Sequence, residues 1–140
     1  MKKSMIIVLI CIVVIVVIIT TVVIVKQLAS KNSNKKPADY TSITMDEAAE
    51  IFATEGSYVI LDVRRADEFA EGHIPGAVNV ANEDILGAKP ELLSDINQTI
   101  YVYCRSGRRS KEASAKLVAI GYTNIIEFGG ILDWKGEIEK

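Results

Sequence analysis

The apolar residues of this chain follow two different patterns. Residues 5–25 form one unbroken apolar run, whereas beyond residue 40 short apolar runs alternate with segments in which apolar residues recur every three or four positions. An unbroken run of this length is typical of a membrane-spanning helix, and the alternation is typical of an α/β domain. The pattern therefore predicts a short N-terminal tail (1–4), a transmembrane helix (5–25), a basic flexible linker (26–39) and a globular domain (40–140).

Strands and helices are predicted to alternate within the globular domain. The capping-box pair Thr44 and Glu47 begins a helix that is closed by Gly56, and the near-continuous apolar run 58–63 indicates a strand buried on both faces. Further strands are expected at 77–80, 99–103 and 124–128. Further helices are expected at 67–71, at 109–120 and, after the glycine pair 129–130, through Trp134. The expected fold class is α/β, with a parallel sheet flanked by helices and preceded by one transmembrane helix.

The run from residue 5 to residue 25 holds 21 residues without a charge, of which 17 are Ile, Val or Leu. With a rise of about 1.5 Å per residue, such a helix crosses a hydrocarbon core of about 30 Å. A cleaved signal peptide is the alternative, since Lys2 and Lys3 precede the run. The apolar region is long for a signal peptide, and residues 28–30 form a poor cleavage pattern. The sequence favours an uncleaved single-pass anchor in contact with membrane lipid.

Charge is divided unevenly between the two parts of the chain. Residues 1–38 hold six lysines and no acid, so residues 39–140 carry a formal charge of −8. An acidic domain argues against nucleic acid as a partner. Only two cysteines are present, Cys11 and Cys104, and Cys11 lies within the predicted span, so no structural disulfide is expected. With one usable cysteine and one histidine, no metal-ligand cluster is expected either.

The candidate chemistry lies in residues 101–110, where an apolar strand runs into a cysteine, a short loop and the start of a helix. Loop amides and the positive end of that helix would face the sulfur of Cys104 and favour its thiolate, which is the nucleophilic form. A buried structural cysteine is the alternative. Arg105, Arg108 and Arg109 favour catalysis, because their mutual repulsion within one loop would be offset by a bound anion.

Several separate motifs resemble those of rhodanese-like domains. The first signature of that family is similar to LDVR (61–64), EF (68–69) and GHIPGA (72–77), and its active-site loop is similar to YCRSGRRS (103–110). Its closing part is similar to GY (121–122), GG (129–130) and Trp134. The resemblance covers roughly residues 40–140. It implies a rhodanese-like fold and a sulfurtransferase that uses no cofactor. Membrane-tethered single-domain versions of the family are familiar in bacteria.

The resemblance also implies a reaction at Cys104. The cysteine takes a sulfane sulfur from a small anion such as thiosulfate, becomes a persulfide, and passes the sulfur to a thiophilic acceptor such as cyanide or another thiol, which can belong to a partner protein. The sulfonate of the donor needs cations, which the loop arginines can supply, and the loop amides can hold the persulfide anion. The residues expected to bind substrate are Arg105, Ser106, Gly107, Arg108, Arg109 and Ser110.

The length of the loop separates this sequence from rhodanese-like phosphatases. Those enzymes use Cys, five residues and then Arg, because their loop must encircle a tetrahedral phosphate. Here the sixth residue after Cys104 is Ser110, and Arg109 comes one place earlier. A phosphate- or arsenate-directed enzyme is therefore disfavoured. A sensing or carrier module, in which Cys104 holds sulfur or an oxidised form as a signal to a membrane partner, remains the alternative function.

Two further positions are candidates for supporting roles. Asp62, like Cys104, is expected at the carboxyl end of a parallel strand, so that both could line one crevice. Asp62 would then orient an arginine beside the loop, or it would pair with the backbone or with Arg64. His73 belongs to a turn motif of the family and is expected to be structural, and Trp134 is expected in the core.

The side of the membrane that carries the domain follows from weak signals. Positive charges alone favour the cytoplasm slightly, because Lys26 and three more linker lysines outnumber Lys2 and Lys3. A two-lysine start that leads directly into an apolar run is typical of a signal anchor, and a domain with a single usable cysteine avoids wrong disulfides outside the cell. We expect residues 40–140 on the extracytoplasmic face of the cell membrane.

Overall fold

The computed structural model describes residues 14, 17–21 and 39–140, and the chain falls into two compact units, Met1–Lys36 and Pro37–Lys140. The predicted tail, most of the predicted span and all of the linker except residue 39 lie outside the described residues. Residues 17–21 are helical. Among the residues that are described, no helix combines the length and apolar character needed to cross a membrane. The membrane anchor stays a prediction.

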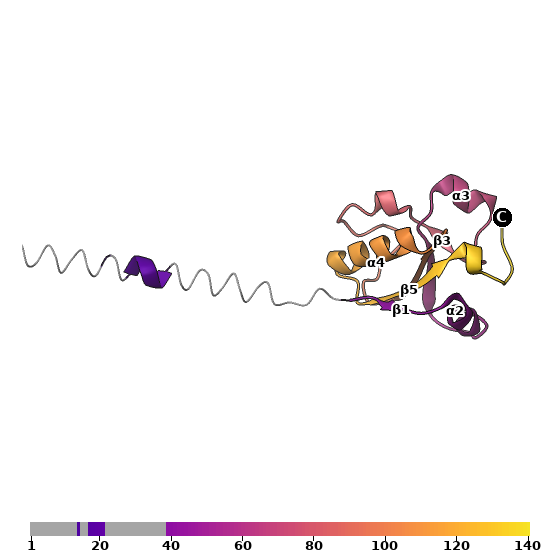
Figure 1. Ribbon diagram of the computed structural model, residues 1–140, viewed down its shortest axis with the longest axis horizontal. Coiled ribbons are helices and arrows are strands. Elements are labelled where there is room, and N and C mark those ends of the chain that lie inside the picture. Colours follow the sequence, from indigo (N-terminus) through magenta and orange to yellow (C-terminus); the bar gives the residue numbers. More distant parts are fainter. Residues whose placement is uncertain (1–13, 15–16, 22–38) are drawn as a thin grey trace, which may run out of the picture. The chain divides into compact units, whose positions relative to one another are not determined.

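The second unit is built on a five-stranded parallel sheet (Figure 1). The strands lie in the order β1-β5-β4-β2-β3, and every neighbouring pair is parallel. They are β1 (Thr41–Ser42), β2 (Tyr58–Asp62), β3 (Val78–Asn79), β4 (Thr99–Cys104) and β5 (Asn124–Gly130). The predicted α/β class with a parallel sheet is confirmed. The strand β1 was not predicted, because its two residues are exposed and show no apolar pattern.

In the second unit, the strands are connected by α2 (Met45–Phe52), α3 (Ala66–Glu71), the short 3₁₀ helix η1 (Asn82–Asp84) and α4 (Arg108–Ile120), and a second 3₁₀ helix, η2 (Ile131–Asp133), follows β5. The predicted capping box is confirmed, since the Glu47 amide donates to Thr44 Oγ1 at 3.2 Å and the Thr44 amide donates to Glu47 Oε2 at 2.7 Å. The helix α2 ends at Phe52 rather than close to Gly56.

Two predicted elements are shorter than expected. The strand predicted at 77–80 is reduced to Val78–Asn79, because β3 is an edge strand that pairs with β2 at only two positions. The last predicted helix, through Trp134, is a single 3₁₀ turn that ends at Asp133. The Trp134 side chain is half-buried and packs against the apolar cluster on the α2 side of the sheet.

The two faces of the sheet carry separate apolar clusters, with α4 on one face and α2 on the other (Figure 1). Successive side chains of a strand point to opposite faces, so the residues of β4 are divided between the clusters. Ile100, Val102 and Cys104 face α4, whereas Tyr101 and Tyr103 face α2. This alternation decides which side chains can meet Cys104.

The pairing of β4 with β5 changes register near its carboxyl end. Val102 lies opposite Glu127, but Cys104 lies opposite Gly130, so β5 contains one extra residue between these two pairs. Such a bulge bends the strand and re-aims its side chains. Gly129, within the bulge, has a φ of +100°, a conformation that favours glycine. The bulge brings the end of β5 under the loop that follows Cys104.

Candidate active site

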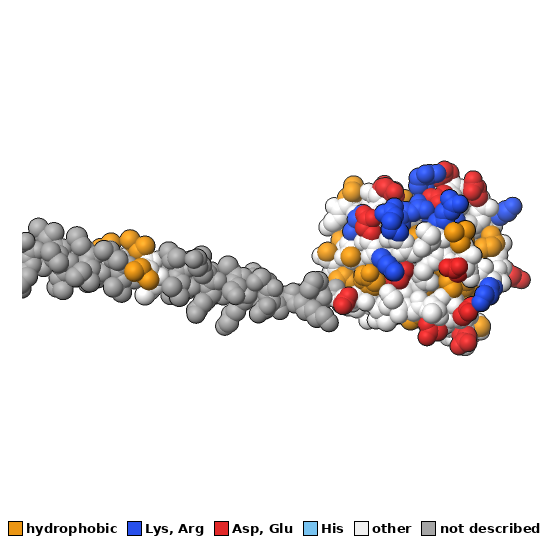
Figure 2. Space-filling view, in the orientation of Figure 1, with side chains coloured by type: hydrophobic (Ala, Val, Ile, Leu, Met, Phe, Trp, Pro, Cys, Tyr) orange, Lys and Arg blue, Asp and Glu red, His pale blue; other side chains and the backbone are white. Residues whose placement is uncertain are grey.

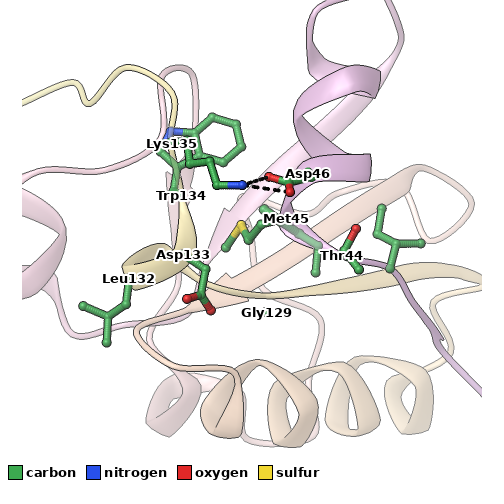
Figure 3. A pocket seen from close by; sticks show the side chains of 10 residues that line it. Thr44, Met45, Asp46, Gly129, Leu132, Asp133, Trp134 and Lys135 are labelled. Atoms are coloured by element: carbon green, nitrogen blue, oxygen red, sulfur yellow. Dashed lines mark hydrogen bonds and ion pairs between the residues drawn. The ribbon is translucent and has the colours of Figure 1, made fainter.

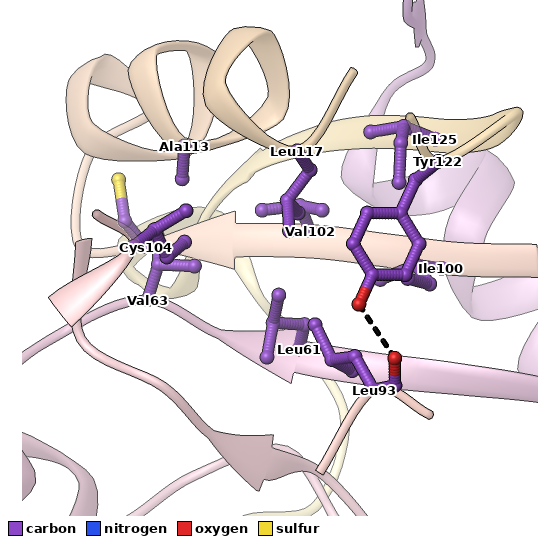
Figure 4. Packing of buried hydrophobic residues seen from close by; sticks show 11 residues of the cluster. Leu61, Val63, Leu93, Ile100, Val102, Cys104, Ala113, Leu117, Tyr122 and Ile125 are labelled. Carbon is purple, nitrogen blue, oxygen red and sulfur yellow. Dashed lines mark hydrogen bonds between the residues drawn. The ribbon is translucent and has the colours of Figure 1, made fainter. Parts of the chain in front are cut away.

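Cys104 is the last residue of β4 and only 1 % exposed. Its side chain lies on the α4 face of the sheet, beside the first turns of α4 and close to Ala113 (Figure 4). The parallel sheet and the short loop thus place the sulfur at the carboxyl end of a central strand, where ligands bind in open α/β sheets. The apolar run before Cys104 and the helical spacing after it predict this position.

The loop from Arg105 to Gly107 turns its backbone toward the sulfur. The Gly107 amide donates a hydrogen bond to Cys104 Sγ at 3.1 Å. Gly107 is the N-cap of α4 and has a φ of +91°, which is why a glycine suits this position. A backbone N–H and the N-terminus of a 13-residue helix both favour negative charge at the sulfur. The geometry can therefore stabilise a thiolate.

The loop lies directly on Gly130, with no room for a side chain there. A Cβ at this position would lie 2.5 Å from the Ser106 Cα and would also meet the Arg105 carbonyl group. The Leu132 amide donates to the same Arg105 carbonyl at 3.3 Å. The glycine pair 129–130 belongs to the motifs that resemble the family. In the structure, Gly130 is the residue against which the backbone of the loop packs.

The three loop arginines differ in what surrounds them. Arg109 is half-buried and makes a two-pronged ion pair with Glu68 of α3, at 2.6 and 2.8 Å. This hydrogen bonding lowers the pKa of Glu68 to about 2. Arg108 is exposed and lies 3.5 Å from Glu112. Arg105 is exposed, and no ion pair joins it to another of the described residues.

A cleft of about 600 Å³ with mixed charge lies beside the loop. Figure 2 shows the corresponding crowding of Lys and Arg with Asp and Glu side chains over one part of the globular unit. The cleft is lined by Arg65, Asp67, Glu68, Glu71, Glu83, Arg105, Ser106, Arg108 and Arg109. Acids compensate much of the positive charge, so the cation expected to be available to a donor is Arg105 rather than all three loop arginines.

Asp62 and Arg64 are brought together, but not with Cys104. Asp62 is fully buried and accepts from Arg64 Nε at 2.9 Å and from Arg64 Nη2 at 2.6 Å. The guanidinium of Arg64 lies 5.8 Å from the ring centroid of Tyr103, which faces α2. Burial, together with the charge of Asp62, raises the pKa of Tyr103. The expected crevice shared by Asp62 and Cys104 is wrong, because the two side chains point to opposite faces of the sheet.

His73 is held in a structural environment. Its ring stacks on Phe69 at 3.7 Å between centroids, and its Nδ1 lies 3.0 Å from the Phe69 carbonyl oxygen. Its backbone pairs with Glu139 in both directions at 2.9 Å, which ties the C-terminal residues to the domain. The turn role expected for His73 agrees with these contacts.

Ser110 and Glu127 form the part of the site that the sequence analysis did not anticipate. Ser110 was expected to bind substrate, but it is fully buried, and its hydroxyl donates to Glu127 Oε1 at 2.7 Å. Its oxygen lies 3.6 Å from the sulfur of Cys104, which donates to it. Glu127 is only 2 % exposed. A signal was present in the sequence, since an acidic residue in the apolar run 125–128 is a charge expected to be buried.

A second hollow, also of about 600 Å³, lies on the α2 side of the sheet (Figure 3). It is lined by Thr44, Met45, Gly129, Leu132, Trp134 and three further residues, together with the ion pair between Asp46 and Lys135, whose closest atoms are 2.8 Å apart. Neither Cys104 nor the loop from Arg105 to Ser110 contributes to it. In the part of the chain that the structure describes, no group of acids, histidine and cysteine could hold a metal ion.

Curated relatives of this chain include proteins named for sulfur chemistry. The chain is 30 % identical over 110 residues to "Putative sulfur carrier protein YrkF" of Bacillus subtilis, a match that covers 78 % of this chain and 58 % of that protein. It is 33 % identical over 73 residues to "Thiosulfate sulfurtransferase PspE" of Escherichia coli, covering 52 % of this chain and 70 % of that protein. The chain thus matches less than two thirds of the first of these relatives.

Solved structures and the family profile agree with these relatives. A crystal structure of a rhodanese-like domain protein from Staphylococcus aureus superimposes with a TM-score of 0.61 at 31 % identity, covering 71 % of this chain and 96 % of that one. The profile of the rhodanese-like domain matches residues 44–137, which include the β4 strand, the Cys104 loop, α4 and the β5 bulge. The chain therefore belongs to the family of rhodanese-like domains.

Proposed function

We propose that this protein is a membrane-anchored sulfurtransferase that moves a sulfane sulfur from a thiosulfate-like anion to a thiophilic acceptor through a persulfide on Cys104. The observation that carries the proposal is the environment of the Cys104 sulfur. The sulfur lies at the N-terminus of α4 and accepts a hydrogen bond from the Gly107 amide at 3.1 Å. Membership of the family and the thiosulfate sulfurtransferase among its relatives support sulfur transfer as the reaction.

The proposed reaction has two balanced steps. The Cys104 thiolate attacks the sulfane sulfur of thiosulfate, the sulfur–sulfur bond of the donor breaks, and sulfite leaves with the bonding electron pair. The persulfide anion then gives its terminal sulfur to cyanide or to a thiolate acceptor, and the Cys104 thiolate is restored. Both anionic states of Cys104 are favoured by the same amide and helix N-terminus. Arg105 is an exposed cation of the loop that has no ion pair among the described residues, and it can hold the sulfonate of the donor.

Turnover can be tested with purified full-length protein in detergent. Thiosulfate and cyanide should yield thiocyanate, and Cys104→Ser should abolish this activity while leaving the unfolding transition in place. Thiocyanate production at the wild-type rate by Cys104→Ser would contradict the proposal. Cys11→Ser is the matched control, because it removes the other cysteine of the chain without touching the loop.

A sulfur carrier without turnover is the second candidate, supported by the name of the Bacillus subtilis relative and by the 1 % exposure of Cys104. The two candidates differ in the fate of the persulfide. A sulfurtransferase passes the outer sulfur of its persulfide to small acceptors such as cyanide, whereas a carrier retains it until a partner protein presents a thiol. Mass spectrometry of Cys104 after addition of thiosulfate, followed by cyanide, distinguishes the two.

The proposal includes the anchor formed by residues 5–25 and an extracytoplasmic position of residues 40–140. The buried sulfur of Cys104 is a poor target for a bulky membrane-impermeant maleimide, so the test needs an exposed reporter. Leu86 is 82 % exposed, and the variant Leu86→Cys in a Cys104→Ser background serves this purpose. Labelling of intact cells supports an outer domain, and labelling only after lysis places the domain in the cytoplasm.

A further inference from the structure

Within the part of the chain that the structure describes, the Glu127 carboxylate is buried without a positive partner. It is 2 % exposed, and no ion pair joins it to a Lys, Arg or His of the described residues. Its hydrogen-bond donors are neutral: the Ser110 hydroxyl at 2.7 Å, the Gly129 amide at 3.0 Å and the Ser42 hydroxyl at 3.2 Å. Burying a carboxylate without a cationic partner is costly, and transfer of a neighbouring proton to it would remove that cost.

A continuous chain of polar atoms links this carboxyl group to the reactive sulfur. The Cys104 thiol donates to Ser110 Oγ at 3.6 Å. The Ser110 hydroxyl lies 3.0 Å from the Gly107 carbonyl oxygen and 3.3 Å from the Gly129 carbonyl oxygen, but its shortest contact as a donor is with Glu127 Oε1, at 2.7 Å. The other oxygen of Glu127 accepts from Ser42, which is exposed at the sheet edge. This series of hydrogen bonds therefore runs from the sulfur, beneath the loop, to the surface of the domain.

The elements packed around this chain of atoms contribute few other charges. On α4, Arg109 interacts electrostatically with Cys104, but its guanidinium is engaged by Glu68 of α3. The loop contributes the Gly107 amide, which donates to the sulfur, and β1 contributes the neutral Ser42. Within the buried part of this series of hydrogen bonds, the groups that can exchange a proton are thus Cys104 and Glu127, with Ser110 between them.

We propose that Glu127 is a positioning residue that takes up the thiol proton of Cys104 through Ser110 and keeps it while the sulfur is anionic. As the S–H bond of Cys104 breaks, its proton passes to Ser110 Oγ, and the hydroxyl proton of Ser110 passes to Glu127 Oε1. The thiol, hydroxyl and carboxylate become a thiolate, a hydroxyl and a carboxylic acid. The net charge of the trio is unchanged, and no proton has to leave the buried site.

Electrostatics favours this arrangement over two separate ionisations. A thiolate and a carboxylate joined through a single hydroxyl would repel each other strongly in a region of low dielectric constant. Two groups coupled in this way lose their protons in two steps that belong to the pair. The inference rests on the proposed function only in that Cys104 becomes an anion, and alkylation reads that anion directly, so it can fail while sulfur transfer stands.

Glu127→Gln is a conservative test of the pair. The amide oxygen can accept from Ser110 and from the Gly129 amide, and the amide nitrogen can donate to Ser42, so the variant can keep every hydrogen bond but cannot take up a proton. The iodoacetamide alkylation rate of Cys104 should be followed against pH in the full-length chain carrying Cys11→Ser. Ser42→Ala is the matched control, since it removes a hydrogen bond to Glu127 outside the path to the sulfur.

The wild-type rate should rise in two pH steps separated by a plateau, and Glu127→Gln should show a single step. Ser42→Ala should retain both steps. A single step in the wild type, or two steps in Glu127→Gln, would overturn the proposal. A purely structural role for Glu127 would change the unfolding transition and leave the shape of the pH profile as it is.

Infrared spectroscopy on the unsubstituted chain provides a second readout that does not depend on a variant. When Cys104 is loaded with sulfur from thiosulfate, the carbonyl stretching band of a protonated carboxyl group should appear and shift on isotope labelling of glutamate. The same band should be absent after loading of Glu127→Gln. Loading that produces no such band in the unsubstituted chain would also overturn the proposal.

Discussion

Two buried carboxyl groups near the ends of strands in one sheet have opposite surroundings. Asp62, at the end of β2, is fully buried, and its carboxylate oxygens accept hydrogen bonds of 2.6–3.0 Å from the guanidinium of Arg64. Glu127, near the end of β5, is 2 % exposed and has neutral donors only among the described residues. A compensated charge fixes the local geometry, because separating the pair leaves an ion buried alone. The acid without a cationic partner is the one that lies on the same face of the sheet as Cys104.

The loop arginines repeat the contrast at the surface. Arg109 is compensated by Glu68 and fixes the start of α4 to α3, whereas Arg105 has no acidic partner within the described part of the chain. By the same reasoning, Arg109 positions the loop and Arg105 is available to bind an anion. Substitutions at Asp62, Glu68 and Arg105 test the contrast between compensated and uncompensated charges, and a substitution at Gly130 tests how the loop itself is supported.

The largest effect is expected at the compensated pair. Asp62→Ala leaves the Arg64 guanidinium buried without a counter-ion and should lower the free energy of unfolding by about 3–5 kcal/mol. Urea denaturation measures the loss. Glu127→Gln should cost about 1 kcal/mol or less, because its hydrogen bonds can be kept. The double variant Asp62→Leu with Arg64→Met should recover most of the stability, and a loss below about 1 kcal/mol in Asp62→Ala would show that the pair is not structural.

Gly130→Ala tests whether the β5 bulge supports the loop. The added Cβ would lie 2.5 Å from the Ser106 Cα, so the backbone of the loop must move. A displacement of about 1 Å at a reacting group can reduce activity about a hundredfold, and the overpacking should cost about 1–3 kcal/mol of stability. Thiocyanate production and urea denaturation measure the two effects.

The matched control for that substitution is Gly56→Ala. Its Cβ would meet only the ring of Tyr58, at 2.8 Å, which is a side chain far from Cys104 in the sequence and on the α2 face. This variant should keep wild-type activity. Equal losses of activity in the two variants would mean that Gly130 has no special relation to the loop.

Glu68→Gln removes the compensation of Arg109 and should change the acid stability. The pKa of Glu68 is lowered to about 2 from its ordinary value of 4.5. A carboxyl group with a lowered pKa stabilises the fold fully above about pH 4.5, and this stabilisation is lost as the pH falls toward 2. Glu68→Gln should cost about 1–2 kcal/mol at pH 7 and show a weaker loss of stability between pH 4.5 and 2.

The control for this pH dependence is Asp67→Asn. The pKa of Asp67 is also lowered to about 2, by Arg65, but both side chains are largely exposed. Exposed ion pairs contribute little to stability, so this variant should follow the wild-type curve closely. A stability profile of Glu68→Gln that is parallel to the wild type between pH 7 and 2 would contradict the role of the Glu68–Arg109 pair.

The smallest effect is expected at the uncompensated arginine. Arg105→Ala should raise the KM for thiosulfate about fivefold, equivalent to about 1 kcal/mol, and leave the unfolding transition unchanged. Arg108→Ala is the matched control, because Arg108 lies 3.5 Å from Glu112 and should affect KM less. Steady-state kinetics at varied thiosulfate concentration measures both. An unchanged KM in Arg105→Ala would mean that Arg105 does not contact the donor.

Local patterns in the sequence were sufficient to predict the central part of the site. The apolar run 99–103, Cys104 and the helical spacing that follows predict a strand, a loop and a helix N-terminus, and the structure has them within one residue. The capping box at Thr44 and the parallel α/β class were predicted for the same reason. Residues close in sequence determine caps, alternation and helical spacing. The membrane span, and the side of the membrane on which the domain lies, are also inferred from the sequence, and both stay predictions.

Only the tertiary structure decided which polar groups surround the sulfur. Glu127 reaches Ser110 because β5 pairs with β4 and gains an extra residue between the pairs Val102↔Glu127 and Cys104↔Gly130. Asp62 is directed away from Cys104 because adjacent strands hold the two side chains on opposite faces. Register, bulges and faces depend on contacts between distant segments, which no local pattern encodes. The cysteine was therefore found from its own neighbours in the chain, and its proton acceptor from the packing of the sheet.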